Sequence, residues 1–147
     1  MPVLSWSAAD LRERGPVVPA VVSPVQPARE AMRAAGRQVP PAAAVTGLID
    51  TGSARSAIDR GTAARLGLRP VGSTLVSTLT SAGGVPVLLY AVQLVLAGQG
   101  SNMAFDMVTV VEASLADQQL GVLIGRDVLA SAVFVYTGPA RQCTISF

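Results

Sequence analysis

The residues best suited to chemistry are Asp50 and the three that follow it, Thr51, Gly52 and Ser53. They come directly after residues 45–49, an apolar run that predicts a short strand. Gly52 permits a tight turn just after the acid, so we expect the carboxylate of Asp50 to project from the end of a sheet. The hydroxyls of Thr51 and Ser53 can hydrogen-bond within such a loop. The segment therefore predicts a rigidly positioned acid–base group.

Two neighbouring carboxylates can carry out acid–base catalysis that a single carboxylate performs poorly. Two carboxylates held about 3 Å apart cannot both ionise, so they share one proton. The ionised member can then deprotonate a bound water while the protonated member donates to a substrate carbonyl. The sequence contains one Asp-Thr-Gly and no second Asp-Thr-Gly or Asp-Ser-Gly. We therefore expect the second aspartate to come from an identical chain across a twofold axis.

The composition removes most rival chemistries. The chain has no His and no Lys, which excludes a Ser-His-Asp triad, a Cys-His pair, an HExxH zinc site, a lysine phosphate loop and a Schiff base. Its eleven cations are all Arg and are not clustered, so we expect no nucleic-acid partner. Cys143 is the only cysteine and cannot form an intrachain disulfide. Carboxylates remain as the natural acid–base groups.

The same composition favours a β-rich fold. Half of the residues are apolar but only 4% are aromatic, and the 14 glycines and 10 prolines indicate many turns. Strands are expected over residues 17–22, 45–49, 74–80, 85–96, 103–111, 121–124, 133–137 and 142–147. Short helices are expected over residues 28–36, 61–66 and 128–132, with a further one around 7–14.

Membrane and export signals are not recognisable in the sequence. No stretch reaches about 18 uninterrupted apolar residues, and residues 1–10 lack a basic region followed by an apolar run. We therefore expect no membrane partner and a cytoplasmic location.

Three segments occur in an order found in a known family. Residues 48–58 carry Asp-Thr-Gly-Ser, residues 122–129 carry Gly-Arg-Asp after an apolar run, and residues 142–147 form a terminal strand. This combination resembles the retropepsin-like aspartic proteases, the single-lobed family of retroviral proteases and their relatives, and is most similar to bacterial members. The resemblance covers residues 16–147 as one protease domain, with residues 1–15 as an N-terminal lead-in.

The resemblance implies a fold and an activity. The fold would be an all-β, closed acid-protease barrel with one or two short helices, assembled as a homodimer through its terminal strands, especially residues 142–147. Two Asp50 carboxylates would activate water to hydrolyse bonds of a peptide or protein substrate. Neither a metal nor an organic cofactor is implied. The alternative is a non-catalytic module of the same fold that dimerises or binds peptides, and a more distant one is a small structural β-barrel whose Asp-Thr-Gly is accidental.

The resemblance also implies roles for individual residues. Asp50 would be the catalytic acid and base, Thr51 would interlock across the dimer axis, and Gly52 and Ser53 would complete the active-site loop. A flap tip over the substrate would comprise Ser81, Ala82, Gly83, Gly84 and Val85, whose four first residues are also a good hairpin-turn signal. A structural brace would comprise Gly125, Arg126 and Asp127. Apolar substrate pockets would be lined by Ile58, Val85 and Val87.

One position departs from the viral pattern. Retroviral members usually have an acid two residues after the Gly of the triplet, where it pairs with the arginine of the second segment. This chain has Ala54 there. We therefore expect Arg126 to find another partner, with Asp127 and Asp59 as candidates.

Overall fold

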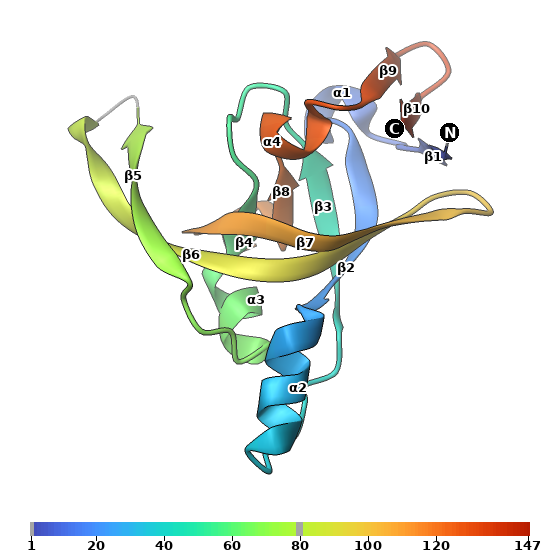
Figure 1. The fold of residues 1–147 in the computed structure, drawn as a ribbon. Coiled ribbons are helices and arrows are strands. Elements are labelled where there is room, and N and C mark those ends of the chain that lie inside the picture. The colour runs from blue at the N-terminus through green and yellow to red at the C-terminus, as the bar shows by residue number, and fades with distance from the viewer. Residues whose placement is uncertain (1, 79–80) are drawn as a thin grey trace.

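The computed structural model describes residues 2–78 and 81–147, and its fold is mostly β (Figure 1). The strands are β1 (Val3–Ser7), β2 (Val17–Pro24), β3 (Ala43–Ile49), β4 (Ala57–Asp59), β5 (Gly72–Thr78), β6 (Ser81–Ala97), β7 (Asn102–Ala113), β8 (Val122–Ile124), β9 (Val133–Thr137) and β10 (Gln142–Ser146). The helices are α1 (Leu11–Arg14), α2 (Gln26–Ala34), α3 (Arg60–Arg65) and α4 (Arg126–Leu129), with a 3-10 turn η1 (Ala116–Gln118). Among these described segments, none of the helices is long and apolar enough to span a membrane.

The larger sheet closes on itself as a barrel. Its strands follow the order β2-β3-β8-β4-β7-β6, and β6 pairs with β2 as well as with β5, which lies outside the ring. Most neighbours are antiparallel, but β3 with β8 and β4 with β7 are parallel. The closed, mostly β fold predicted from the sequence is therefore confirmed.

Alternating side chains fill the barrel. In β2, Val18, Ala20 and Val22 are buried while the residues between them are at least partly exposed. Leu94 and Leu96 of β6 alternate in the same way. Branched aliphatic side chains at a period of two fill a small closed sheet well, which explains how so few aromatic residues suffice.

A bulge allows β6 to serve both the barrel and a hairpin. Val92 and Leu94 of β6 pair with Val108 and Phe105 of β7, so β7 has one extra residue over this stretch. Such a bulge increases local twist and bends the strands. One edge of β6 accordingly pairs with β5 in its first half and with β2 in its second half.

Within residues 1–15, predicted as an N-terminal lead-in, strand β1 is paired into a sheet. β1 pairs with β10 and β10 with β9, in a three-stranded sheet of order β1-β10-β9. Leu4 is fully buried, and Trp6 is 3% exposed and donates its indole N–H to the carbonyl of Val17 at 2.7 Å. The alternation of residues 4–7, apolar then polar, is a strand signal that is easily missed over so few residues.

The hairpin of β5 and β6 lies where it was predicted, but its turn does not. The turn was expected at residues 81–84, whereas β6 already begins at Ser81. Residues 79–80 lie outside the described residues, and with them the end of the strand predicted over 74–80. The predicted flap-tip residues are thus located on β6 itself.

Two glycines explain the misplaced turn. Gly83 and Gly84 lie within β6 with φ of 140° and 80°, values that favour glycine strongly. On the opposite strand, the pairing register shifts between Val76 and Thr78. The glycine pair, read from the sequence as a turn, marks an irregular stretch of strand.

The helices lie close to their predicted positions, but their first and last residues differ from the predicted ones. The helix expected around 7–14 is reduced to α1, because β1 extends to Ser7. The helix expected over 128–132 corresponds to α4. It starts two residues earlier, at Arg126, with Gly125 as its N-cap.

Asp59 fixes the start of α3 and connects it to the loop after β7. Its Oδ2 accepts hydrogen bonds from the N–H groups of Gly61 and Thr62, at 2.9 and 3.3 Å, and its Oδ1 accepts from Leu115 and Ala116, at 2.9 and 3.1 Å. The residue is 8% exposed. Burial opposes ionisation, but the four backbone donors outweigh it and lower the pKa of Asp59.

We predict that Asp59→Asn lowers the free energy of unfolding at pH 7 by about 1–3 kcal/mol. The amide oxygen can replace one carboxylate oxygen, but the NH₂ group would face two N–H donors. Because the folded-state pKa lies below the usual 3.8, the stabilisation is complete at neutral pH and is lost as the pH falls through the folded pKa. Urea denaturation between pH 3 and pH 7 measures this, with Asp117→Asn, an exposed change, as control. Equal pH dependence in Asp59→Asn and the wild type would contradict the assignment.

Candidate active site

Asp50 lies at the carboxyl end of β3, where the parallel pairing with β8 ends. Its N–H donates to the carbonyl of Ile124 at 2.9 Å, so the first residue of the loop is still attached to the sheet. The carboxylate is partly exposed, and its Oδ1 accepts from the N–H of Gly52 at 2.9 Å. A Cβ on Gly52 would lie 3.1 Å from that oxygen, so glycine permits the close approach. The acid is fixed at its base and open at its tip.

Arg126 holds the loop through main-chain atoms. Its guanidinium donates to the carbonyl of Thr51 at 2.8 Å, and its N–H donates to the carbonyl of Ser53 at 2.8 Å. The expectation that Asp127 or Asp59 partners Arg126 is therefore wrong. The backbone carbonyl occupies the role because Ala54 supplies no carboxylate, and both acids are held by other donors.

Ser56 and Asp127 form the inner part of the same brace. Asp127 accepts from the N–H and the hydroxyl of Ser56, at 2.9 and 2.7 Å, and from the N–H of Val128 at 2.9 Å. The Ser56 hydroxyl in turn accepts from the N–H of Gly125 at 3.0 Å. A Cβ on Gly125 would lie 2.6 Å from the carbonyl carbon of Arg55, so the two loops touch backbone to backbone.

Ser56 is the residue that the sequence analysis missed. It is 0% exposed, which makes it a buried polar residue between an exposed loop and an apolar strand. A serine at such a boundary is a weak signal on its own. Its importance depends on Gly125 and Asp127, which lie about 70 residues away in the sequence.

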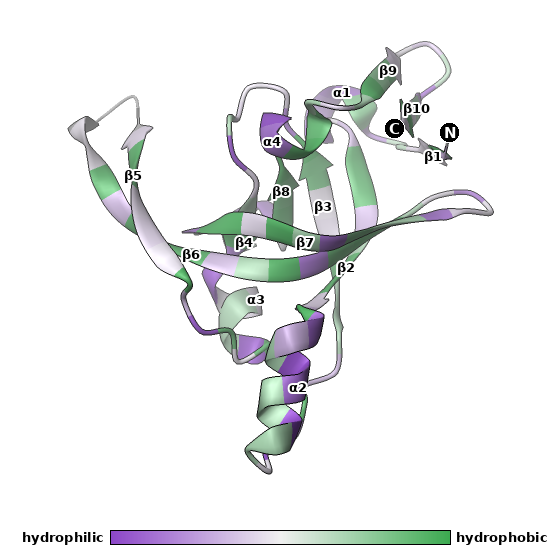
Figure 2. Cartoon of the chain, viewed as in Figure 1, coloured by the Kyte–Doolittle hydropathy of each residue, from purple (hydrophilic) through white to green (hydrophobic). Residues whose placement is uncertain are grey.

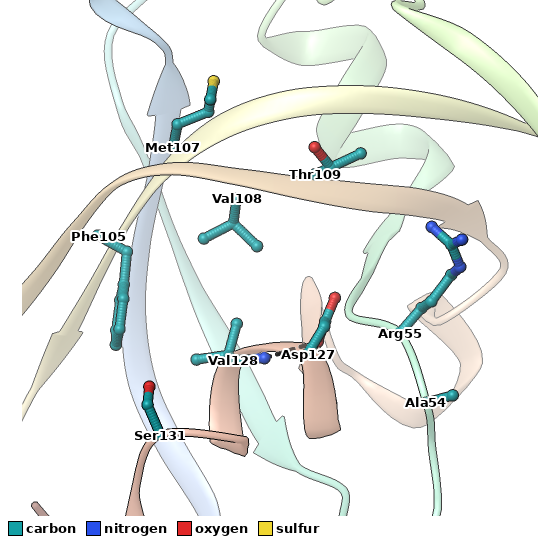
Figure 3. Close-up of a pocket in the computed structure, with 9 residues that line it drawn as sticks. All are labelled: Ala54, Arg55, Phe105, Met107, Val108, Thr109, Asp127, Val128 and Ser131. Carbon is teal, nitrogen blue, oxygen red and sulfur yellow. Dashed lines mark hydrogen bonds between the residues drawn. The ribbon is translucent and has the colours of Figure 1, made fainter. Parts of the chain in front are cut away.

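A hollow of about 620 Å³ lies beside the loop. Figure 3 shows Val108 of β7 directed toward Asp127 and Val128 of α4, with Arg55 on one side and Phe105 on the other. Apolar side chains thus form much of a wall next to the loop that carries the acid.

The other predicted site residues are distributed differently from expectation. Ile58 is 0% exposed and belongs to the core, so its assignment to a substrate pocket is wrong. Val85, 44% exposed, and the half-buried Val87 lie on the hairpin strand β6. Figure 1 shows the distal end of this hairpin, the loop after β3, and the β1-β10-β9 sheet along one side of the molecule.

Metal ligands do not gather near the loop. In residues 2–78 and 81–147, no group of three or more Cys, Asp or Glu side chains is placed to hold a metal ion. The arrangement found is a single carboxylate, open to solvent, on a loop that main-chain hydrogen bonds hold in place.

Sequence comparison identifies the family. A family model described as aspartyl protease matches residues 36–128, more than half of the 147-residue chain. The chain therefore belongs to the aspartyl protease family. No curated protein is similar enough to match it.

Comparison with solved structures finds retropepsin-like and retroviral proteases. A retropepsin-like aspartic protease from Rickettsia conorii is similar with a TM-score of 0.56 and 14% identity, over 98% of this chain and 89% of that one. The EIAV protease complexed with the inhibitor HBY-793 gives 0.40 and 15%, over 84% and 91%. The retroviral protease-like domain of Ddi1 from Leishmania major gives 0.42 and 16%, over 84% and 81%. The retropepsin-like fold inferred from the sequence motifs is confirmed by the first of these.

We predict that Ser56→Ala lowers the free energy of unfolding by about 1–3 kcal/mol, because it leaves the buried N–H of Gly125 without its acceptor and removes a donor from Asp127. The midpoint of urea denaturation measures the loss. Ser114→Ala, at an exposed serine, is the matched control and should change it by less than about 0.5 kcal/mol. Equal midpoints for the two variants would show that the brace does not stabilise the loop.

Proposed function

We propose that the chain is an aspartic endopeptidase that works as a homodimer, with one Asp50 from each copy. The observation that carries this is the state of the Asp50 carboxylate, which is partly exposed and pinned at Oδ1 by Gly52. Within the described part of the chain, no hydrogen bond to its Oδ2 is formed. A carboxylate with a structural role is normally buried, and both of its oxygens accept hydrogen bonds, as in Asp59.

The proposed reaction needs two such carboxylates. The ionised one takes a proton from a water molecule as the water oxygen attacks the peptide carbonyl carbon. The protonated one gives its proton to the carbonyl oxygen, which forms a neutral tetrahedral diol. As the diol collapses, the C–N bond breaks, one diol hydroxyl returns its proton to the ionised carboxylate, and the departing amine takes the proton of the other carboxyl group. Rigid placement of both acids would contribute to the rate enhancement by holding water and substrate in reacting geometry.

The second copy must approach the side of the molecule that carries the Asp50 loop. The terminal strand β10 was expected to form the intersubunit sheet, but β1 and β9 pair with both of its edges. The outer strands of that sheet are β1 and β9. Val3, Val133 and Val135 on these strands are exposed although they are apolar. We propose that they contribute to the interface, because apolar surface of this kind is typical of contacts between identical chains.

Substrate side chains would lie in the hollow beside the loop. Its apolar wall, made by Phe105, Val108 and Val128, takes the part that was assigned to Ile58. A preference for apolar residues next to the cleaved bond follows from this wall.

We predict that Asp50→Asn reduces peptide hydrolysis by roughly a thousandfold or more, because the amide cannot exchange a proton with water. Cleavage of a quenched fluorescent peptide library at acidic pH measures it, with circular dichroism and sedimentation to verify fold and assembly. Asp117→Asn, an exposed acid, is the matched control and should retain full activity. Cleavage by purified Asp50→Asn would refute the assignment. Peptide binding without turnover in the wild type would favour the non-catalytic module.

We also predict that mixing decides whether two chains share one site. In a freshly mixed equimolar sample of wild type and Asp50→Asn, about one dimer in two has both acids. After subunit exchange only about one in four does, so activity should fall to about half of that of the fresh mixture. Exchange is verified by native mass spectrometry with one chain isotope-labelled. Activity that stays constant while mixed dimers are seen would show that one Asp50 suffices.

A further inference from the structure

A second hollow lies at the far end of the molecule from the Asp50 loop. It has a volume of about 340 Å³, is partly open to solvent, and is lined by α2 and by the segment that follows α3, residues 67–71. Figure 1 shows α2 at the opposite end of the barrel from the loop after β3. Nothing in the proposed protease mechanism uses this hollow.

The lining is almost entirely apolar. Met32 of α2 and Leu68 form its deeper part: Met32 is buried, and Leu68 packs against the main core. Ala28, Ala31 and Ala35 of the helix side are small and leave the space open. Apolar and hydrophilic bands alternate around α2 in Figure 2.

Two arginines complete the lining, and no acid is among the lining residues. Arg37 and Arg69 form no side-chain hydrogen bond or ion pair within the described residues. Arg29 of the same region is different, because its guanidinium is occupied by Ser23, the carbonyl of Pro24, Gln26 and Gln93. The hollow is thus an apolar chamber with two uncommitted cations.

We propose that this chamber binds a medium-chain carboxylic acid. A hollow of about 340 Å³ falls in the size range of small-molecule sites and has room for an alkyl chain of medium length. The alkyl chain would be removed from water against Met32 and Leu68. The carboxylate would receive charge-assisted hydrogen bonds from Arg37 and Arg69, whose planar guanidinium groups match carboxylate geometry.

Titration calorimetry with decanoate, kept below its micelle-forming concentration, tests the proposal. The neutral decanol is the matched ligand, and amide chemical shifts in ¹H–¹⁵N spectra locate the site. We expect decanoate to bind at least about tenfold more tightly than decanol, a difference of about 1.4 kcal/mol. The shifts should concentrate in residues 25–37 and 67–71.

Two variants separate the cation and cavity contributions. Arg37→Gln/Arg69→Gln should weaken decanoate binding about tenfold without changing decanol binding, whereas Arg12→Gln/Arg14→Gln removes the same charge from α1 and should change neither. Ala31→Leu fills the chamber while keeping a good helix former and should weaken both ligands. Absent binding, equal affinities for the two ligands, or shifts centred elsewhere would each overturn the proposal. All of these readouts are independent of peptidase activity.

Discussion

The parallel pairing of β3 with β8 is the constraint on which the rest of the site depends. It joins Leu48 to Leu123 and Ile49 to Ile124, so both strands end at the same place. The two loops that leave them therefore meet: one carries Asp50 and the other carries Gly125, Arg126 and Asp127. A parallel pair cannot be made by a hairpin. The chain must travel through β4 to β7 between them, and that detour builds the barrel.

The two loops are joined by hydrogen bonds that involve main-chain groups, the Arg126 guanidinium, the Ser56 hydroxyl and the Asp127 carboxylate. Arg126 binds two carbonyls of the Asp50 loop, and Asp127 binds the N–H and hydroxyl of Ser56. Acids in this region have separate uses as a result. Both carboxylate oxygens of Asp127 and of Asp59 accept hydrogen bonds from neighbouring donors, whereas one oxygen of Asp50 has no hydrogen-bond partner in the described chain. Saturation by hydrogen bonds thus separates these two acids from Asp50, the acid proposed to take a proton from water.

Features that depend on local pattern are predictable from the sequence, whereas features that depend on the pairing of distant residues are not. Asp50, Gly125 and Arg126 were recognisable because strand, glycine and charge occur side by side in the sequence. The pairing of β1 with β10 was not, because it joins residues about 140 positions apart and only four residues show the alternation. The same holds for Ser56, whose partner is Asp127. Gly83 and Gly84 show a local pattern that predicts the wrong structure. Their positive φ angles occur in an irregular strand as well as in a turn, so the glycine pair alone does not indicate which one forms.

Ala54 supplies no carboxylate to Arg126, so the loop is stabilised in another way. An aspartate there would neutralise Arg126 by an ion pair, and such an exposed pair contributes at most about 1 kcal/mol. The Thr51 carbonyl provides a charge-assisted hydrogen bond of similar strength and ties the guanidinium to the residue next to Asp50. The bond acts on the backbone at residue 51, so it restrains the turn without depending on a second side chain. Burial of Ser56 then supplies the larger energetic penalty for displacing the loop.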